Sequence, residues 1–336
     1  MHMHTRIFSG LAAGLLCGSG AMAQSNVTIY GRLDLGLRWT GNANAAGASM
    51  KSLDSGSTSG SRFGLKGSED LGDGLKALFT LEQGINPDTG TLAQSGRGWG
   101  RQSWVALQNN VGTLTAGRQY SPIYVIEATN EPFGPYNLYE PGFIYDNYTG
   151  GNRWDNAIKL ESLFSGVSLA AMVSAGEGST GRKQGVSAGY ASGPFTINGA
   201  WQQTALTSGA KQHKAWTLGG TWNVAPVKLY LSYLDHKSDT TTQTNKAWAV
   251  GASYAVMPLL DLVAGYYRDA QRNADGKKQE LALMANYKLS KRSNVYVQAD
   301  RGTLSGGYAS NVFDAYAWPT GITSRTTATV GLRHMF

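Results

Sequence analysis

Apolar and polar residues alternate with a period of two along most of this chain, and this pattern limits the possible fold more than any other feature. Between Val27 and Trp39 the odd positions are apolar or glycine, whereas the even positions include Arg32 and Arg38. Successive side chains of a β-strand point to opposite sides of the sheet, so such a segment predicts a strand with one apolar face. The same alternation returns at residues 75–81, 167–173, 227–233 and 281–287.

Turn residues and polar segments divide the alternating pattern into sixteen predicted strands. Short turns such as 71–74 and 192–194 alternate with long polar connections such as 40–60 and 121–152. This layout is typical of an all-β, antiparallel transmembrane barrel with short periplasmic turns and long external loops. The Gly/Ser-rich tract Ser55–Ser61 is expected to be part of the first external loop. The strands are predicted to begin near residues 27, 61, 74, 101, 112, 153, 166, 183, 194, 214, 226, 246, 258, 279, 293 and 325.

Composition narrows the class further. Only 15% of the residues are charged, against about 25% in typical soluble domains, while 41% are hydrophobic. This disfavours an ordinary soluble enzyme, a coiled coil and a disordered regulator. After the N-terminus no stretch is long and apolar enough to cross a bilayer as a helix. The strands of a soluble β-sandwich or lectin also alternate apolar and polar residues. In those folds, however, the polar face is exposed to water, and a single domain needs fewer strands.

The N-terminal segment predicts a secretory signal peptide. Arg6 precedes an apolar run from residue 7 to 16, and Ala21-Met22-Ala23 is a small-x-small cleavage site. We expect residues 1–23 to be removed, which leaves 24–336 as a single barrel domain. Removal of Arg6, the only charged residue of this segment, lowers the formal charge from +7 to +6, and Cys17 is lost too. No basic cluster suited to nucleic acid remains.

The end of the chain is a further sign of an outer-membrane protein. Phe336 is aromatic and shares its parity with the apolar residues Leu332 and Val330. Outer-membrane barrels present such a last strand to the barrel insertion machinery. We therefore predict that Phe336 is part of a C-terminal insertion signal and that outer-membrane lipids surround the barrel.

Several motifs spread over the chain resemble one known family. The chain is similar to the trimeric general-diffusion porins of Gram-negative bacteria, in the branch common in beta-proteobacteria. The resemblance implies a homotrimer in the outer membrane and a third external loop that folds inward to narrow the pore. The motifs that carry it are Val27–Gly31, Ser61–Gly72, Gly74–Ala77, Gly117–Tyr120, Leu289–Arg292 and Gly331–Phe336.

The third long loop, residues 121–152, has an unusual composition. It contains seven aromatic residues and four acids but no lysine or arginine. A loop this long is usually functional, and most of its aromatic residues are expected to pack on the inner barrel wall. The segment Glu131-Pro132-Phe133-Gly134 resembles the acidic stretch that porins place at the constriction. Glu82, which faces inward by parity and could pair with a wall arginine, joins Glu131, Glu140 and Asp146 on the predicted acidic side.

Four arginines are predicted to form the basic side of the constriction. Arg62, Arg101 and Arg153 begin descending strands, and Arg118 ends an ascending one, so all four share a height in the wall. The porin resemblance places constriction arginines at the same positions. Parity directs Arg62 and Arg153 into the lumen, whereas Arg101 and Arg118 share the parity of lipid-facing residues and need a bulge or loop to turn inward. Parity also predicts that Arg32, Arg38, Lys66 and Lys159 face the lumen.

These features together predict a passive channel for ions and small hydrophilic solutes, with a weak to moderate preference for anions. One alternative is a substrate-selective channel for small organic acids. Another is a barrel adhesin or surface enzyme that acts through its external loops. The histidines after residue 23 have no neighbouring pattern of a catalytic base and nucleophile, and no cofactor-binding or metal-ligand spacing occurs, so no enzymatic activity is predicted.

Overall fold

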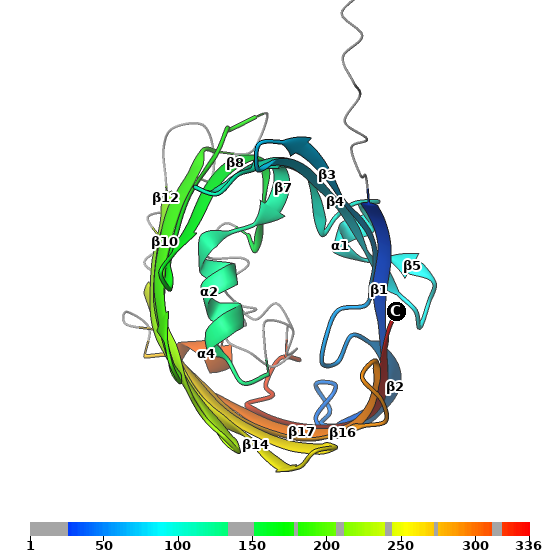
Figure 1. Cartoon of the computed structure of the whole chain (residues 1–336). Coiled ribbons are helices and arrows are strands. Elements are labelled where there is room, and N and C mark those ends of the chain that lie inside the picture. The colour runs from blue at the N-terminus through cyan, green and yellow to red at the C-terminus, as the bar shows by residue number, and fades with distance from the viewer. Residues whose placement is uncertain are drawn as a thin grey trace, which may run out of the picture.

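The computed structural model describes residues 26–133, 151–177, 181–205, 212–238, 244–271, 275–310 and 318–336. Within these ranges one antiparallel sheet of 18 strands closes on itself, because β1 (Asn26–Thr40) pairs with β18 (Ser324–Met335). Apart from the short β2 (Met50–Ser55) and β5 (Thr91–Leu92), sixteen long strands remain. Figure 1 shows the ring that they form. The predicted sixteen-stranded antiparallel barrel is confirmed.

All sixteen long strands begin within two residues of the predicted positions. The predicted signal peptide, residues 1–23, lies outside the described part of the chain. The strands between β1 and β18 are β3 (Arg62–Gly72), β4 (Leu75–Asn86), β6 (Gln102–Gln108), β7 (Thr113–Tyr120), β8 (Arg153–Phe164), β9 (Val167–Ser174), β10 (Lys183–Ser192), β11 (Phe195–Ala205), β12 (Gln212–Val224), β13 (Val227–Ser238), β14 (Thr244–Met257), β15 (Leu260–Gln271), β16 (Lys277–Lys288) and β17 (Ser293–Ser305).

The wall is apolar outside and polar inside, as the alternation requires. On β1, Val27 and Ile29 are exposed, whereas Asp34 on the opposite face is fully buried. Terminal Phe336 completes the closure, because its backbone exchanges two hydrogen bonds with Gly31 at 3.0 and 3.1 Å. Its role as an insertion signal remains a prediction. In the ranges given above, no helix is both long and apolar enough to cross a membrane.

The second wall strand is interrupted, which the sequence pattern does not predict. β2 pairs with the outer half of β1 and β3 with its first half, while residues 56–61 leave the wall between them. The prediction that Ser55–Ser61 lies in an external loop is therefore wrong. The carboxylate of Asp34 holds the segment against the inner wall, because it accepts hydrogen bonds from the backbone N–H groups of Thr58 and Ser59 at 3.0 and 2.8 Å.

Helix α2 (Pro122–Asn130) runs inside the barrel, where the sequence predicts only a long loop (Figure 1). The Ser121 side chain caps its first turn by accepting a hydrogen bond from the Tyr124 N–H at 3.4 Å. The helix packs on β10–β13, where Ile123 and Ile126 meet small and apolar wall residues. The other helices in the described ranges are the single turns α1 (Ala93–Gly96) and α4 (Gly307–Ser310).

Glycines in the wall make room for the chain at the end of α2. A Cβ atom at Gly219 would lie 2.4 Å from the Asn130 amide nitrogen, and one at Gly251 would lie 2.5 Å from a Pro132 ring carbon. Real Cβ atoms do not approach other atoms so closely. These positions therefore need glycine, since any larger residue would push the segment after α2 away from the wall.

Candidate functional site

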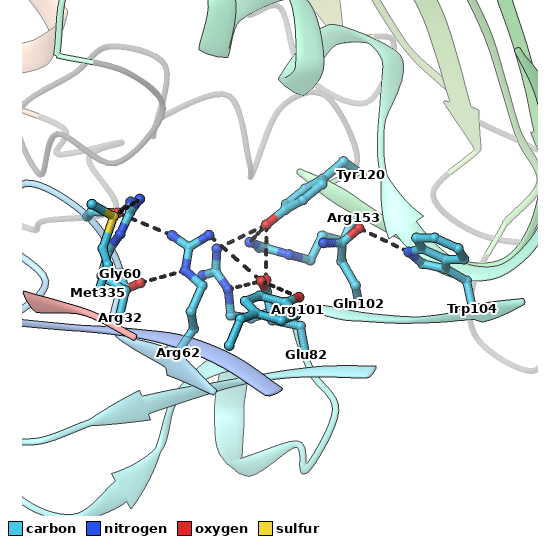
Figure 2. A network of polar contacts seen from close by, with 12 residues as sticks. Arg32, Gly60, Arg62, Glu82, Arg101, Gln102, Trp104, Tyr120, Arg153 and Met335 are labelled. Carbon is cyan, nitrogen blue, oxygen red and sulfur yellow. Dashed lines mark hydrogen bonds and ion pairs between the residues drawn. The ribbon is translucent and has the colours of Figure 1, made fainter. Parts of the chain in front are cut away.

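Arginines from several parts of the wall meet around Glu82 of β4 (Figure 2). The Arg101 Nε donates a hydrogen bond to Glu82 Oε1 at 2.7 Å, and Arg62 Nη1 lies 3.9 Å from Glu82 Oε2. Arg153 joins them through the Tyr120 hydroxyl, which accepts from Arg101 at 2.9 Å and from Arg153 at 3.3 Å. We call Arg32, Arg62, Arg101 and Arg153, with Glu82 and Tyr120, the arginine cluster.

Glu82 lies among the arginines and not opposite them. The prediction that it belongs to the acidic side of a constriction is therefore wrong, whereas its predicted pairing with a wall arginine is present. Its side chain is 3% exposed, and its second oxygen accepts a hydrogen bond from the Tyr30 hydroxyl at 3.0 Å. Glu82 is thus shared by Arg62 and Arg101, and the cluster as a whole holds four guanidinium groups and one carboxylate, so it carries a net positive charge.

The inward segment 56–61 orients two of these arginines. Arg32 and Arg62 are directly opposite each other on β1 and β3, so their positive charges repel. Ser59 Oγ accepts hydrogen bonds from both side chains, and the Gly60 carbonyl accepts one from Arg62 Nε at 3.0 Å. These acceptors offset the repulsion and fix both guanidinium groups. Asp34 is the one acid in β1 and lies on the lumen face between Arg32 and Arg38, and this inward carboxylate is the sequence signal that points to such a contact.

Arg101 and Arg118 reach their places in different ways. Arg101 precedes β6, so the parity of that strand does not govern it, and it turns inward to Glu82 with 1% of its side chain exposed. Arg118 lies where the pairing of β7 with β8 shifts register. Its partners are Asp155 and the Gly100 carbonyl, the latter at 2.8 Å. The structure thus brings Arg62, Arg101 and Arg153 together and leaves Arg118 in a separate ion pair.

The other residues predicted to face the lumen have nearby partners. Arg38 pairs with Asp54 at 2.7 Å, which leaves little net charge at that point. The Lys66 ammonium lies 5.5 Å from the centre of the Tyr30 ring, and Lys159 pairs with Glu161 at 3.0 Å.

The described acids of the third loop are buried against the wall. Glu127 of α2 accepts hydrogen bonds from the hydroxyls of Thr217 and Ser232, the latter at 2.7 Å. Glu131 is 5% exposed and borders the same small cavity as Ser232 and Tyr267. The prediction that Glu131 lines the open pore is therefore wrong, because the hydroxyl groups of β12 and β13 draw this end of the helix onto the wall. Glu140 and Asp146 lie outside the described residues.

Burial raises the pKa of the Glu127 carboxyl, and the hydrogen bonds that it accepts offset only part of this effect. The folded state therefore binds the proton more tightly than the unfolded chain does. The protonated Glu127 carboxyl therefore stabilises the docked position of α2. This stabilisation is fully present below about pH 4.3, the ordinary glutamate pKa, and is lost as the pH rises through the pKa of Glu127 in the folded state.

We expect hydrogen exchange of the α2 amides, corrected for intrinsic rates, to show weaker protection as the pH rises. Glu127→Gln keeps the size of the side chain but cannot ionise, so this pH dependence should shrink markedly. Glu161→Gln, at a partly exposed residue outside the helix, is the matched control and should keep the wild-type profile. Identical profiles for the wild type and Glu127→Gln would contradict the assignment.

The described part of the chain holds no group of three or more His, Cys, Asp or Glu side chains placed to bind a metal ion. A closed barrel with an apolar exterior, a charged lumen and a helix laid along the inner wall is the architecture of a channel-forming outer-membrane protein. Residues 10–307 match the family described as Gram-negative porin. The chain belongs to this family, and it lies in the bacterial outer membrane.

Comparisons with individual proteins agree with this assignment. The chain is 31% identical to outer membrane porin protein 32 of Delftia acidovorans, over 97% of this chain and 99% of that protein. It is 28% identical to an outer membrane porin protein of Bordetella pertussis, with the same coverage. Among solved structures, the anion-selective porin from Comamonas acidovorans superimposes with a TM-score of 0.81 at 26% identity, over 93% of this chain and all of that one. These relatives are channel proteins, and the chain is a porin rather than an enzyme.

Proposed function

We propose that this porin is a water-filled channel through which ions and small hydrophilic solutes diffuse passively, with a preference for anions. The observation that carries the preference is the arginine cluster, which holds four guanidinium groups and one carboxylate. Arg62 and Arg101 lie at Glu82, Arg153 joins them through Tyr120, and Arg32 lies opposite Arg62. Fixed charges on the wall of a narrow pore raise the local concentration of ions of the opposite sign. Glu127 and Glu131 are buried against the wall, so these two carboxyl groups are not exposed to the open pore.

The anion-selective porin from Comamonas acidovorans supports the same preference, since it shares the fold and 26% of its sequence with this chain. Selection in this proposal needs no covalent step and no energy source. Solutes are sieved by size, and the arginine cluster then lowers the free energy of an anion relative to a cation at the same place.

Reversal potentials in planar bilayers under a salt gradient test the proposal. With potassium chloride, whose two ions have similar mobilities, the sign of the reversal potential reports the more permeant ion. We expect chloride to be favoured and the preference to weaken as salt rises, because screening shortens the reach of the arginine charges. A reversal potential whose sign shows that potassium permeates more readily than chloride would exclude the proposed preference for anions.

A substrate-selective channel for small organic acids is the second candidate. The Tyr120 and Tyr124 rings stack with centroids 4.6 Å apart, and the Arg153 guanidinium lies 4.6 Å from the centre of the Tyr120 ring. Such a surface can hold the carboxylate and the apolar part of one solute. Saturable block of single-channel currents by a small carboxylate would favour this candidate, whereas a general pore shows no saturation.

We also propose that the functional unit is a homotrimer and that residues 1–23 are a signal peptide, which leaves 24–336 as the barrel domain. OmpT of Vibrio cholerae, solved in a trimer form, has the same fold with a TM-score of 0.74 at 17% identity. Crosslinking of the protein in outer-membrane vesicles tests the trimer, and N-terminal sequencing of the purified protein tests the cleavage site.

A further inference from the structure

The inward segment of residues 56–61 places the charges of Arg32 and Arg62 in the lumen. Ser59 Oγ accepts a hydrogen bond from a guanidinium nitrogen of each arginine, and the bond from Arg62 is 3.2 Å long. The Gly60 carbonyl accepts a second one from Arg62 at 3.0 Å (Figure 2). The direction in which both guanidinium groups point therefore depends on where this segment lies.

The remaining polar contacts of the two guanidinium groups are weaker. Arg32 Nη2 lies 3.3 Å from the Met335 sulfur, and a thioether is a weak acceptor. Arg62 Nη1 lies 3.9 Å from Glu82, which is longer than a hydrogen bond, and that carboxylate already accepts from Arg101. Since Arg32 and Arg62 repel each other, the segment is the main contact that holds both charges in place.

Asp34 holds the segment against the wall at both ends and in the middle. Its backbone carbonyl accepts hydrogen bonds from the Gly56 N–H at 2.8 Å and from the Ser61 hydroxyl at 3.2 Å. Its carboxylate oxygen Oδ2 accepts from the N–H and the hydroxyl of Thr58 at 3.0 and 2.6 Å, and from the Ser59 N–H at 2.8 Å. The main chain of this residue thus fixes the ends of the segment, and its carboxylate fixes the middle, where Ser59 contacts the arginines.

Tyr296 of β17 binds the other oxygen of the same carboxylate. Its hydroxyl donates a hydrogen bond to Asp34 Oδ1 at 2.6 Å, and its side chain is almost fully buried. A Cβ atom at Gly331 of β18 would lie 2.2 Å from the Tyr296 ring, so glycine at that position makes room for the ring. The Asp34 carboxylate therefore has four hydrogen-bond donors and no exposed surface, so a permeating ion does not contact it.

We propose that Asp34 is a positioning residue for anion selection, which acts through the inward segment and the two arginines that the segment orients. This inference rests on the proposed anion preference of the channel. Without the carboxylate, the N–H groups of Thr58 and Ser59 lose their acceptor, so the middle of the segment leaves the wall and the Ser59 hydroxyl moves away from Arg32 and Arg62. The two guanidinium groups then repel each other and move away from the path of the ions.

Two substitutions of Asp34 separate its positioning role from the effect of its charge. Asp34→Asn and Asp34→Ala remove the same charge, but the asparagine oxygen can still accept from Thr58 and Ser59 while its amide donates to the Tyr296 hydroxyl, and alanine can do neither. Reversal potentials in a potassium chloride gradient give the ratio of chloride to potassium permeability. We expect this ratio to be about fourfold lower for Asp34→Ala than for Asp34→Asn, since two charges that move from about 6 to about 10 Å from the ion path have an effect of this size after screening.

Ser59→Ala tests the next step without any change in charge. It removes the acceptor that Arg32 and Arg62 share and leaves Asp34 in place, so its permeability ratio should be about twofold lower than that of the wild type. The matched control is Ser57→Ala, which removes a buried hydroxyl of the same segment. That hydroxyl accepts from Arg38 at 3.2 Å and lies outside the arginine cluster, so the control should keep the wild-type ratio.

Equal permeability ratios for Asp34→Asn and Asp34→Ala would overturn the proposal, because Asp34 would then act through its charge alone. A wild-type ratio in Ser59→Ala would overturn it as well, and this variant alone decides if Asp34→Ala does not form channels. The reversal potential of the wild type reports the anion preference by itself, whereas the comparison of the variants holds whichever ion the wild type prefers. Failure of the proposed function and failure of this inference are therefore distinguishable.

Discussion

The double substitution Arg62→Glu/Arg153→Glu is expected to turn the channel from anion-preferring to cation-preferring. It changes four units of charge within the arginine cluster while Arg101 remains paired with Glu82. A unit charge about 6 Å from a permeating ion contributes about 0.7 kcal/mol even at the dielectric constant of water. The change of four charge units raises the free energy of an anion at the cluster and lowers that of a cation. Even after screening by salt, the ratio of anion to cation permeability should therefore change by at least about tenfold.

Reversal potentials of the wild type and the double variant in the same salt gradient measure this change. The matched control is Lys291→Glu/Arg292→Glu, which makes an equal charge change in the exposed turn between β16 and β17. The control should keep the sign of the wild-type reversal potential. If both variants behave alike, the net charge of the protein sets its selectivity and the arginine cluster does not.

Replacement of Arg101 by alanine is expected to cause the largest loss of stability of any single arginine substitution in the cluster. Arg101 and Glu82 are almost fully buried and 2.7 Å apart. Removing one partner leaves a buried charge without its main partner, which typically costs about 3–5 kcal/mol of unfolding free energy. Unfolding in urea from lipid vesicles, followed by tryptophan fluorescence, should show a lower midpoint for Arg101→Ala.

A double-mutant cycle separates this effect from simple loss of packing. Arg101→Ala/Glu82→Ala removes both charges, so it should recover part of the stability that Arg101→Ala loses, with a coupling energy above about 1 kcal/mol. Strict additivity of the two single substitutions would mean that the ion pair contributes nothing and that Arg101 acts through its bulk alone. Arg97→Ala, at an exposed arginine that pairs with Asp155, is a suitable control.

The wall of this barrel could be predicted from the sequence because it follows local rules. A lipid-facing side chain must be apolar and its neighbour polar, so periodicity gives the strands and the directions of Arg62 and Lys66 without any knowledge of tertiary structure. The turns between strands carry their own signals. Strand starts were accordingly predicted to within two residues.

The contents of the lumen depend on contacts between distant residues, which no local pattern records. The inward path of residues 56–61 depends on Asp34, more than twenty positions away. The buried position of Glu127 depends on the hydroxyl groups of Thr217 and Ser232, about a hundred positions later. A charged side chain in a loop is ordinarily expected to be exposed to solvent. The burial of Glu127 and Glu131 could therefore not be inferred from their neighbours in the sequence.

The position of α2 also has a consequence for how the molecule assembles. The helix belongs to the connection between β7 and β8, but its docking surface is on β10–β13, which are synthesised later. A contact cannot form before both of its partners are in place, so a partly assembled barrel has nowhere to put this helix. The final position of α2 in the lumen therefore depends on strands that lie far from it in the sequence.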